Sequence, residues 1–207
     1  MRYIQSLCGV SPLVPLELIK EIAESLQDNP SDVSVRWVFF RSGVMLDIFT
    51  VAFFGHREIN DSFKIEERLE EEIYRLLGEK EYVDFLVGRN GEFDQFASSA
   101  VLRVRKRYRD DNSSLILVLP YPKADYLNNV EYYEEYYSEI EISHVASVAH
   151  PKAAIQIRNR EMVDRSDLIV CCIERESGGA WQTVKYAMEH GKTIINLANE
   201  DETVNLF

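Results

Sequence analysis

Nearly continuous apolar runs recur along the chain after residue 47 and alternate with segments of helical periodicity. The runs are rich in β-branched and aromatic residues, which is typical of strands buried on both faces. They cover residues 48–54, 82–87, 115–120, 166–173 and 193–197. In the segment after the first run, apolar residues recur at three- and four-residue spacing, which predicts a helix from about Ser62 to Gly78. Strands alternating with helices form βαβ units, so the sequence predicts an α/β, Rossmann-like three-layer fold with a mostly parallel five-strand sheet.

Two segments interrupt this alternation. Residues 1–47 precede the first core strand and form an N-terminal extension, in which we expect a helix and a possible hairpin. Residues 48–207 form the Rossmann-like domain. Within that domain, residues 126–142 are acidic and rich in tyrosine. We expect a solvated excursion whose rings pack on the domain, and a lid or a dimer contact is the alternative.

The net charge of −12 bears on the class of partner. Binding of nucleic acid without sequence preference depends on basic residues that neutralise phosphates, so this charge argues against DNA or RNA. The one basic cluster, Arg103 to Arg109, falls where a helix should end, and there it complements the helix dipole. The sequence therefore makes DNA binding the weakest of the functions considered.

Other features of the composition indicate the compartment and exclude some cofactors. Three cysteines, two of them adjacent, make no disulfide framework and indicate a reducing cytosol. The most apolar window is interrupted by charges that a bilayer would not tolerate, and the N-terminus lacks a signal-peptide pattern. We therefore expect a cytoplasmic protein that has no membrane partner. The four histidines are not clustered at ligand spacing, so no metal site is expected, and no cofactor is identified.

The end of the first strand carries Gly55, His56 and Arg57. Glycine lets a backbone approach a ligand closely, and arginine supplies a planar fork of donors suited to phosphate or carboxylate. Histidine can donate, accept or carry charge near neutral pH. The structural alternative is that Arg57 pairs with a nearby acid and that His56 caps a turn.

The second strand is followed by Gly88, Arg89, Gly91 and Asp94. Two glycines before a helix N-terminus can form an anion cradle, because free N–H groups and the helix dipole point to the same place. Asp94 would either favour the dipole or accept a hydrogen bond from a ribose hydroxyl.

The fourth strand is followed by Ser177, Gly178 and Gly179, which again lead into a helix. With the common strand order 3-2-1-4-5, strands one and four are neighbours, so this loop and the first one line the same crevice. Upstream of that strand, Arg158 and Asn159 lie on a helix, from which Arg158 either stays on the surface or reaches into the crevice. Convergence of these loops favours a phosphate-bearing ligand.

The chain resembles the FGHR-type branch of the SLOG superfamily, Rossmann-like relatives of the LOG phosphoribohydrolases and of the DNA-processing protein DprA. The resemblance covers about residues 48–197 and lies in four ordered motifs: FGHR (54–57), GRNGEFD (88–94), RNREMVDRSDLIV (158–170), and SGGA (177–180) followed by GKTIINL (191–197). It implies a nucleotide or nucleotide-derived ligand over the glycine-rich loops, often in a homodimer, and links to bacterial conflict and stress systems.

The resemblance leaves enzymatic activity open. LOG-type enzymes carry a PGGxGTxxE stretch whose glutamate works with an upstream arginine at an N-glycosidic bond. Arg158 occupies the position of that arginine, but Lys185 stands where the glutamate would fall. Acid/base help would then need another donor, such as Asp94 or His56.

We therefore predict a cytosolic domain that binds or senses a nucleotide or nucleotide derivative. In it, Arg57, Arg158 and the glycine-loop amides hold phosphate, while Asp94 or Asn159 contacts the sugar. The first alternative is a nucleotide-processing enzyme acting at an N-glycosidic bond. The second is an interaction protein whose crevice is vestigial.

Overall fold

A seven-stranded sheet with the order β4-β3-β2-β1-β5-β6-β7 forms the centre of the domain. The computed structural model describes residues 47–199 and 203–204, which belong to the unit Val38–Phe207. All neighbouring strands are parallel except the antiparallel pair β6 and β7. The strands are β1 (Ile48–Gly55), β2 (Tyr82–Val87), β3 (Ser113–Leu119), β4 (Glu139–Ile142), β5 (Leu168–Cys172), β6 (Thr193–Asn196) and β7 (Thr203–Val204).

The α/β class and the order of the five predicted strands are confirmed, because these strands correspond to β3-β2-β1-β5-β6. The predicted number of strands was too low. The sheet gains β4 at one edge and β7 at the other. β4 lies inside the 126–142 segment, for which we had expected a solvated excursion whose rings pack on the domain. The helix and hairpin expected in the N-terminal extension fall on residues outside the described ones.

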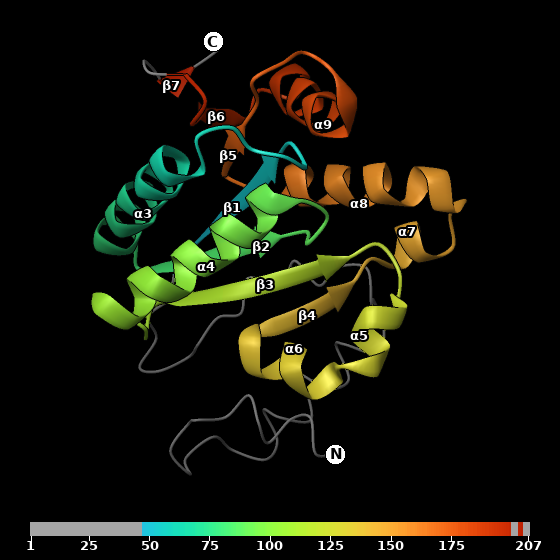
Figure 1. Ribbon diagram of the computed structural model, residues 1–207, viewed down its shortest axis with the longest axis horizontal. Coiled ribbons are helices and arrows are strands. Elements are labelled where there is room, and N and C mark those ends of the chain that lie inside the picture. The colour runs from blue at the N-terminus through green and yellow to red at the C-terminus, as the bar shows by residue number, and fades with distance from the viewer. Residues whose placement is uncertain (1–46, 200–202, 205–207) are drawn as a thin grey trace. The chain divides into compact units, whose positions relative to one another are not determined.

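Helices cover both faces of the sheet (Figure 1). The longer helices are α3 (Ser62–Glu79), α4 (Glu92–Arg107), α8 (Pro151–Arg165) and α9 (Gly178–Glu189), and the shorter ones are α5 (Ala124–Asn128), α6 (Val130–Tyr136) and α7 (His144–Ser147). Gly78 lies within α3 and does not end it, since the helix runs to Glu79. No helix in the described part of the chain is long and apolar enough to cross a membrane.

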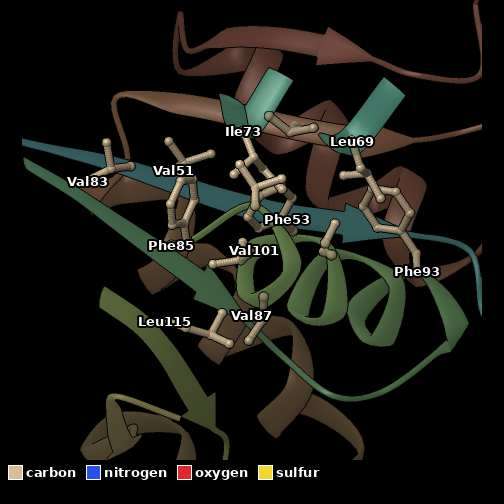
Figure 2. Close-up of a cluster of buried hydrophobic side chains, with 14 of the residues drawn as sticks. Val51, Phe53, Leu69, Ile73, Val83, Phe85, Val87, Phe93, Val101 and Leu115 are labelled. Carbon is tan, nitrogen blue, oxygen red and sulfur yellow. The ribbon is translucent and has the colours of Figure 1, made fainter. Parts of the chain in front are cut away.

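Alternate side chains of β1 pack in two separate hydrophobic cores, one on each face of the sheet. Both sets are therefore apolar, which explains why the apolar run is continuous. Val51 and Phe53 pack in the cluster that contains the buried residues of α3 and α4. Ala52 and Phe54 pack in the cluster that contains the buried residues of α8 and α9. Figure 2 shows the first cluster, in which the Phe53 and Phe85 rings lie 6.0 Å apart between sheet and helices. The sheet is therefore buried on both faces, as in other Rossmann-like domains.

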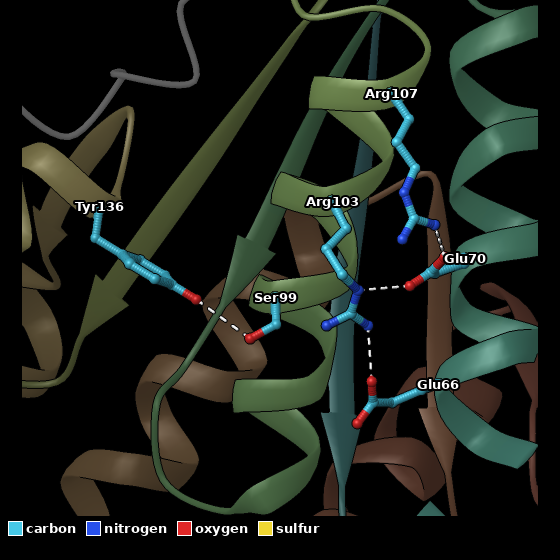
Figure 3. Close-up of polar contacts among 6 residues, drawn as sticks. All are labelled: Glu66, Glu70, Ser99, Arg103, Arg107 and Tyr136. Carbon is cyan, nitrogen blue, oxygen red and sulfur yellow. Dashed lines mark hydrogen bonds and ion pairs between the residues drawn. The ribbon is translucent and has the colours of Figure 1, made fainter. Parts of the chain in front are cut away.

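Two residues of the basic cluster at the end of α4, Arg103 and Arg107, form ion pairs with α3 (Figure 3). Arg103 contacts Glu66 at 2.8 Å and Glu70 at 2.5 Å, and Arg107 contacts Glu70 at 2.9 Å. These side chains remain at least a quarter exposed, so each pair contributes about 0–1 kcal/mol. Part of the cluster therefore connects α4 to α3, and Arg109 pairs separately with Asp111.

Asp84 on β2 makes the stability of the fold depend on pH. Burial, and secondarily the charge of Glu141, raise the pKa of Asp84 to about 6, although Arg165 acts in the opposite direction. The folded protein therefore holds this proton more tightly than the unfolded chain does, and the free energy of unfolding rises as the pH falls from 7 toward 4. We expect Asp84→Asn to stabilise the protein at pH 7 by about 1–3 kcal/mol and to flatten this slope. Urea unfolding at several pH values measures both effects. The exposed Asp110→Asn serves as control, and an Asp84→Asn profile parallel to wild type would contradict the assignment.

Candidate functional site

The loops that follow β1 and β5 meet at the carboxyl edge of the sheet. The two strands are parallel neighbours, with Gly55 in register with Cys172, and the His56 N–H donates to the Cys172 carbonyl at 3.3 Å. Between these loops, the β2–α4 loop and α8 lies an open cleft of about 440 Å³. The structure brings all the predicted site residues except Arg89 to this cleft: Gly55, His56, Arg57, Gly88, Gly91, Asp94, Arg158, Asn159, Ser177, Gly178 and Gly179.

Arg158 forms the floor of the cleft. It is 1% exposed, and its Nη1 donates to the Val118 carbonyl at 2.7 Å. A Cβ on residue 88 would lie 2.4 Å from that Nη1. Residue 88 must therefore be glycine for the guanidinium to pack against the loop. Burial lowers the pKa of Arg158 to about 10, while the Asp94 carboxylate opposes this shift. Arg158 therefore remains a cation at neutral pH.

Asp94 fills the N-terminus of α4. The Asn90 N–H donates to its carboxylate at 2.6 Å, and the side chain is buried. Burial raises its pKa, which the Asn90 amide, Arg158 and Lys123 oppose. Lys123 also donates to the Asn90 Oδ1 at 2.6 Å. The anion cradle expected at this helix start thus holds the protein's own carboxylate, which leaves little room for an external phosphate there.

Gly55 is required by packing. A Cβ on this residue would lie 2.3 Å from the ring of the buried Phe93 on α4. The glycine therefore lets the first turn of α4 sit against the end of β1, and we had assigned this close approach to a ligand. The Glu92 N–H donates to the Arg57 carbonyl at 3.0 Å, which further joins the two loops.

The N-terminus of α9 is open to the cleft. Ser177 precedes the helix without a side-chain cap, and no acidic residue lies in the first turn. Gly178 has a φ of 84°, and the space where its Cβ would stand is empty. The first N–H groups of a helix have no partner within it, and the dipole favours an anion there. Arg57 and Arg175 are exposed and line the same cleft.

Asn159 and Gln156 tie α8 to the start of α9. The Asn159 Nδ2 donates to Thr183 Oγ1 at 2.9 Å, and the Gln156 Nε2 donates to the Gly179 carbonyl at 3.1 Å. These contacts fix the position of the open helix end relative to Arg158. We had predicted that Asp94 or Asn159 contacts the sugar, and the amide nitrogen of Asn159 is engaged within the protein.

His56 and Arg158 each contribute a buried nitrogen that has no partner among the described residues. The atoms are His56 Nε2 and Arg158 Nε. Burial, and then the charge of Arg175, lower the pKa of His56, while Glu174 opposes the shift. The imidazole is therefore neutral at pH 7 and can exchange a hydrogen bond with a bound group.

Arg89 points away from the cleft. Its backbone is left-handed, with a φ of 54°, and its guanidinium lies 4.5 Å from the centre of the Tyr133 ring. Its Nη1 lies 3.4 Å from the Tyr137 hydroxyl oxygen. The predicted contact of Arg89 with phosphate is not supported by this position. Nothing in the sequence marks the left-handed backbone that redirects the side chain.

Sequence reasoning missed several residues that shape the cleft. Asn90 and Arg175 lie in loops that the sequence had indicated as part of the site. The sequence did not indicate that these two residues themselves line the cleft. Gln156 lies two residues before Arg158 in the same helix, and Lys123 follows β3 without any recognisable motif. Within residues 47–199 and 203–204, no group of three His, Cys, Asp or Glu side chains is arranged to hold a metal ion.

No protein-family model matches this chain, and no curated protein matches its sequence. Similarity is found among solved structures. DNA processing protein A from Streptococcus pneumoniae aligns with a TM-score of 0.53 and 19% identity over 71% of this chain. The chain shares a Rossmann-like fold with that protein. The alignment spans 49% of the pneumococcal protein, about half its length.

A second structure is DNA processing protein A from Helicobacter pylori, which is described as binding single-stranded DNA. It aligns with a TM-score of 0.49 and 15% identity over 70% of this chain and 63% of its own.

The similarity to the pneumococcal protein corrects two expectations. We had argued from the net charge against nucleic acid as a partner, and we had predicted sensing of a small nucleotide as the main function. Both predictions are wrong in the light of a fold shared with a DNA processing protein. Net charge is a weak criterion for such a partner because it counts acids on every surface, whereas binding depends on the charges that face the ligand.

Proposed function

We propose that this chain binds single-stranded DNA through the cleft at the ends of β1 and β5. In this proposal, a backbone phosphate lies at the N-terminus of α9 between Arg57 and Arg175. The observation that carries it is the open start of α9 beside two exposed arginines, since phosphate is the anion that such helix ends hold in Rossmann-like folds.

The interior of the cleft supports binding of one phosphate. The start of α4 is already neutralised by Asp94, so α9 offers the open helix end. Arg158 adds a buried positive charge beneath the β2–α4 loop, near the Asp94 carboxylate, and its lowered but still basic pKa keeps that charge at neutral pH. A buried cation acts more strongly than an exposed one because water screens it less.

The size of the cleft supports a single strand. A volume of about 440 Å³ is in the range of pockets that enclose one small ligand, comparable to one nucleotide unit. A strand whose backbone can bend is able to lower one phosphate into this space. Similarity to a DNA processing protein supports DNA as the polymer.

Assignment to the FGHR branch of the SLOG superfamily belongs to the same proposal. Two of the four motifs that carry the resemblance, Phe54–Arg57 and Ser177–Ala180, line the cleft. Their convergence supports a common binding role.

Fluorescence anisotropy with a labelled 20-nucleotide oligothymidine tests the proposal. We expect the wild type to bind at low salt and the double variant Arg57→Ala/Arg175→Ala to bind at least about 10-fold more weakly. The slope of log K against log salt should also become shallower by about 0.7 for each phosphate that the variant no longer neutralises.

The matched control is Arg75→Ala/Arg109→Ala. It removes the same charge from exposed arginines near the opposite edge of the sheet, where Arg75 pairs with Glu79 and Arg109 with Asp111. Equal losses in both double variants would show that overall charge governs binding. An absence of wild-type binding at low salt would refute the proposed function.

A further inference from the structure

A tyrosine-rich surface, formed by Tyr132 and Tyr133 of α6, lies next to the cleft. It is not part of the proposed phosphate site. Arg89 connects the two regions, because its neighbours Gly88 and Asn90 line the cleft while its own guanidinium lies over α6. The guanidinium carbon lies 4.5 Å from the Tyr133 ring centre and 5.8 Å from that of Tyr132.

The two tyrosines have different exposures. Tyr133 is 3% exposed, and its hydroxyl donates to the Asp125 carboxylate. Burial and this bond raise its pKa to about 12, so the ring is a neutral, fixed support. Tyr132 is 51% exposed and stands edge-on to Tyr133, with ring centres 5.8 Å apart at 83°. The Tyr132 ring is therefore held by its neighbour while half of its surface meets solvent.

Charges around this ring indicate which part of a ligand can lie there. The same helix carries the exposed acids Glu131, Glu134 and Glu135. Carboxylates repel phosphate, so the backbone of a strand is disfavoured over α6. An uncharged aromatic group is not repelled, and it can stack on a tyrosine ring or on the guanidinium plane of Arg89.

We infer that Tyr132 and Arg89 form a stacking surface for an unpaired base of the strand whose phosphate lies in the cleft. This inference rests on the proposed function and names the chemical group that the site reads beyond phosphate. A base within a duplex has both faces covered by its neighbours, so this surface favours single-stranded over double-stranded DNA.

The test compares two labelled oligonucleotides with equal numbers of phosphates, one of thymidines and one abasic. We expect Tyr132→Ala to weaken binding of the thymidine oligonucleotide about 10-fold and to leave binding of the abasic one unchanged. Tyr132→Phe, which keeps the ring, should bind as the wild type does. Tyr108→Ala is the matched control, because Tyr108 is 46% exposed and packs on Tyr74, away from α6.

The outcomes separate this inference from the proposed function. Binding that is lost on both oligonucleotides in Arg57→Ala/Arg175→Ala, but only on thymidines in Tyr132→Ala, supports both. If Tyr132→Ala matches the wild type on both oligonucleotides, or weakens both equally, the stacking surface is refuted and the cleft stands. If the wild type binds neither oligonucleotide, both ideas fail. Far-UV circular dichroism verifies that each variant is folded. Comparison of folded Tyr132→Phe with folded Tyr132→Ala then isolates the contribution of the ring.

Discussion

Replacing Asp94 by alanine should lower the free energy of unfolding by about 1–3 kcal/mol. The variant leaves Arg158 buried without its nearby carboxylate, and it removes the acceptor of the Asn90 N–H. A buried donor that loses its acceptor retains the cost of leaving water, and the loss of a nearby negative charge adds to the cost of burying the Arg158 cation. Urea denaturation followed by circular dichroism measures it.

Three further variants identify the cause. Asp94→Asn keeps an acceptor oxygen for Asn90 and should lose less stability than Asp94→Ala. Asp94→Ala/Arg158→Met removes both charges and should recover part of the loss. Asp111→Ala breaks an exposed pair with Arg109 and should cost less than about 1 kcal/mol. A loss for Asp94→Ala as small as that of Asp111→Ala would show that the carboxylate does not balance Arg158.

Replacing Phe93 by alanine should also destabilise the protein by about 3–5 kcal/mol. Phe93 is fully buried in the first turn of α4, and it packs directly on the end of β1 (Figure 2). The loss includes the hydrophobic transfer of the ring and the cavity that it leaves. Thermal and urea unfolding measure this loss.

Gly55 provides a sharp control for this packing. Gly55→Ala alone should cost about 1–3 kcal/mol, because its methyl group would stand 2.3 Å from the Phe93 ring. In the double variant the methyl group enters space that the ring has left, so the combined loss should be smaller than the sum of the two single losses. Strict additivity would contradict direct contact between the two positions.

Much of the fold could be predicted from the sequence because its central strands are buried on both faces. Such strands have continuous apolar sequences, and their order follows from the short right-handed connections of βαβ units. The edge strands carry weaker signals. β4 is the four-residue stretch Glu139–Ile142, in which acids alternate with isoleucines, and β7 has two residues. Periodicity over so few residues does not separate a strand from a loop.

The loops that form the candidate site could be predicted from the sequence, but the contacts that each of their side chains makes could not. The loops converge because parallel strands end at the same edge. The burial of Arg158 depends on Gly88 and on the Val118 carbonyl, which are 70 and 40 residues away in the chain. No local pattern contains such long-range contacts. The direction of Arg89 depends in turn on a single backbone angle.

The single open helix end at the cleft has a consequence for how a DNA strand would become covered. Because Asp94 already occupies the start of α4, the described part of each copy offers one open helix start at the cleft for a phosphate. A strand held by a single copy leaves quickly, whereas copies side by side on the same strand, if joined to one another, rebind before it escapes. Avidity, set by the number of linked copies and their spacing, would then determine how long the strand remains coated.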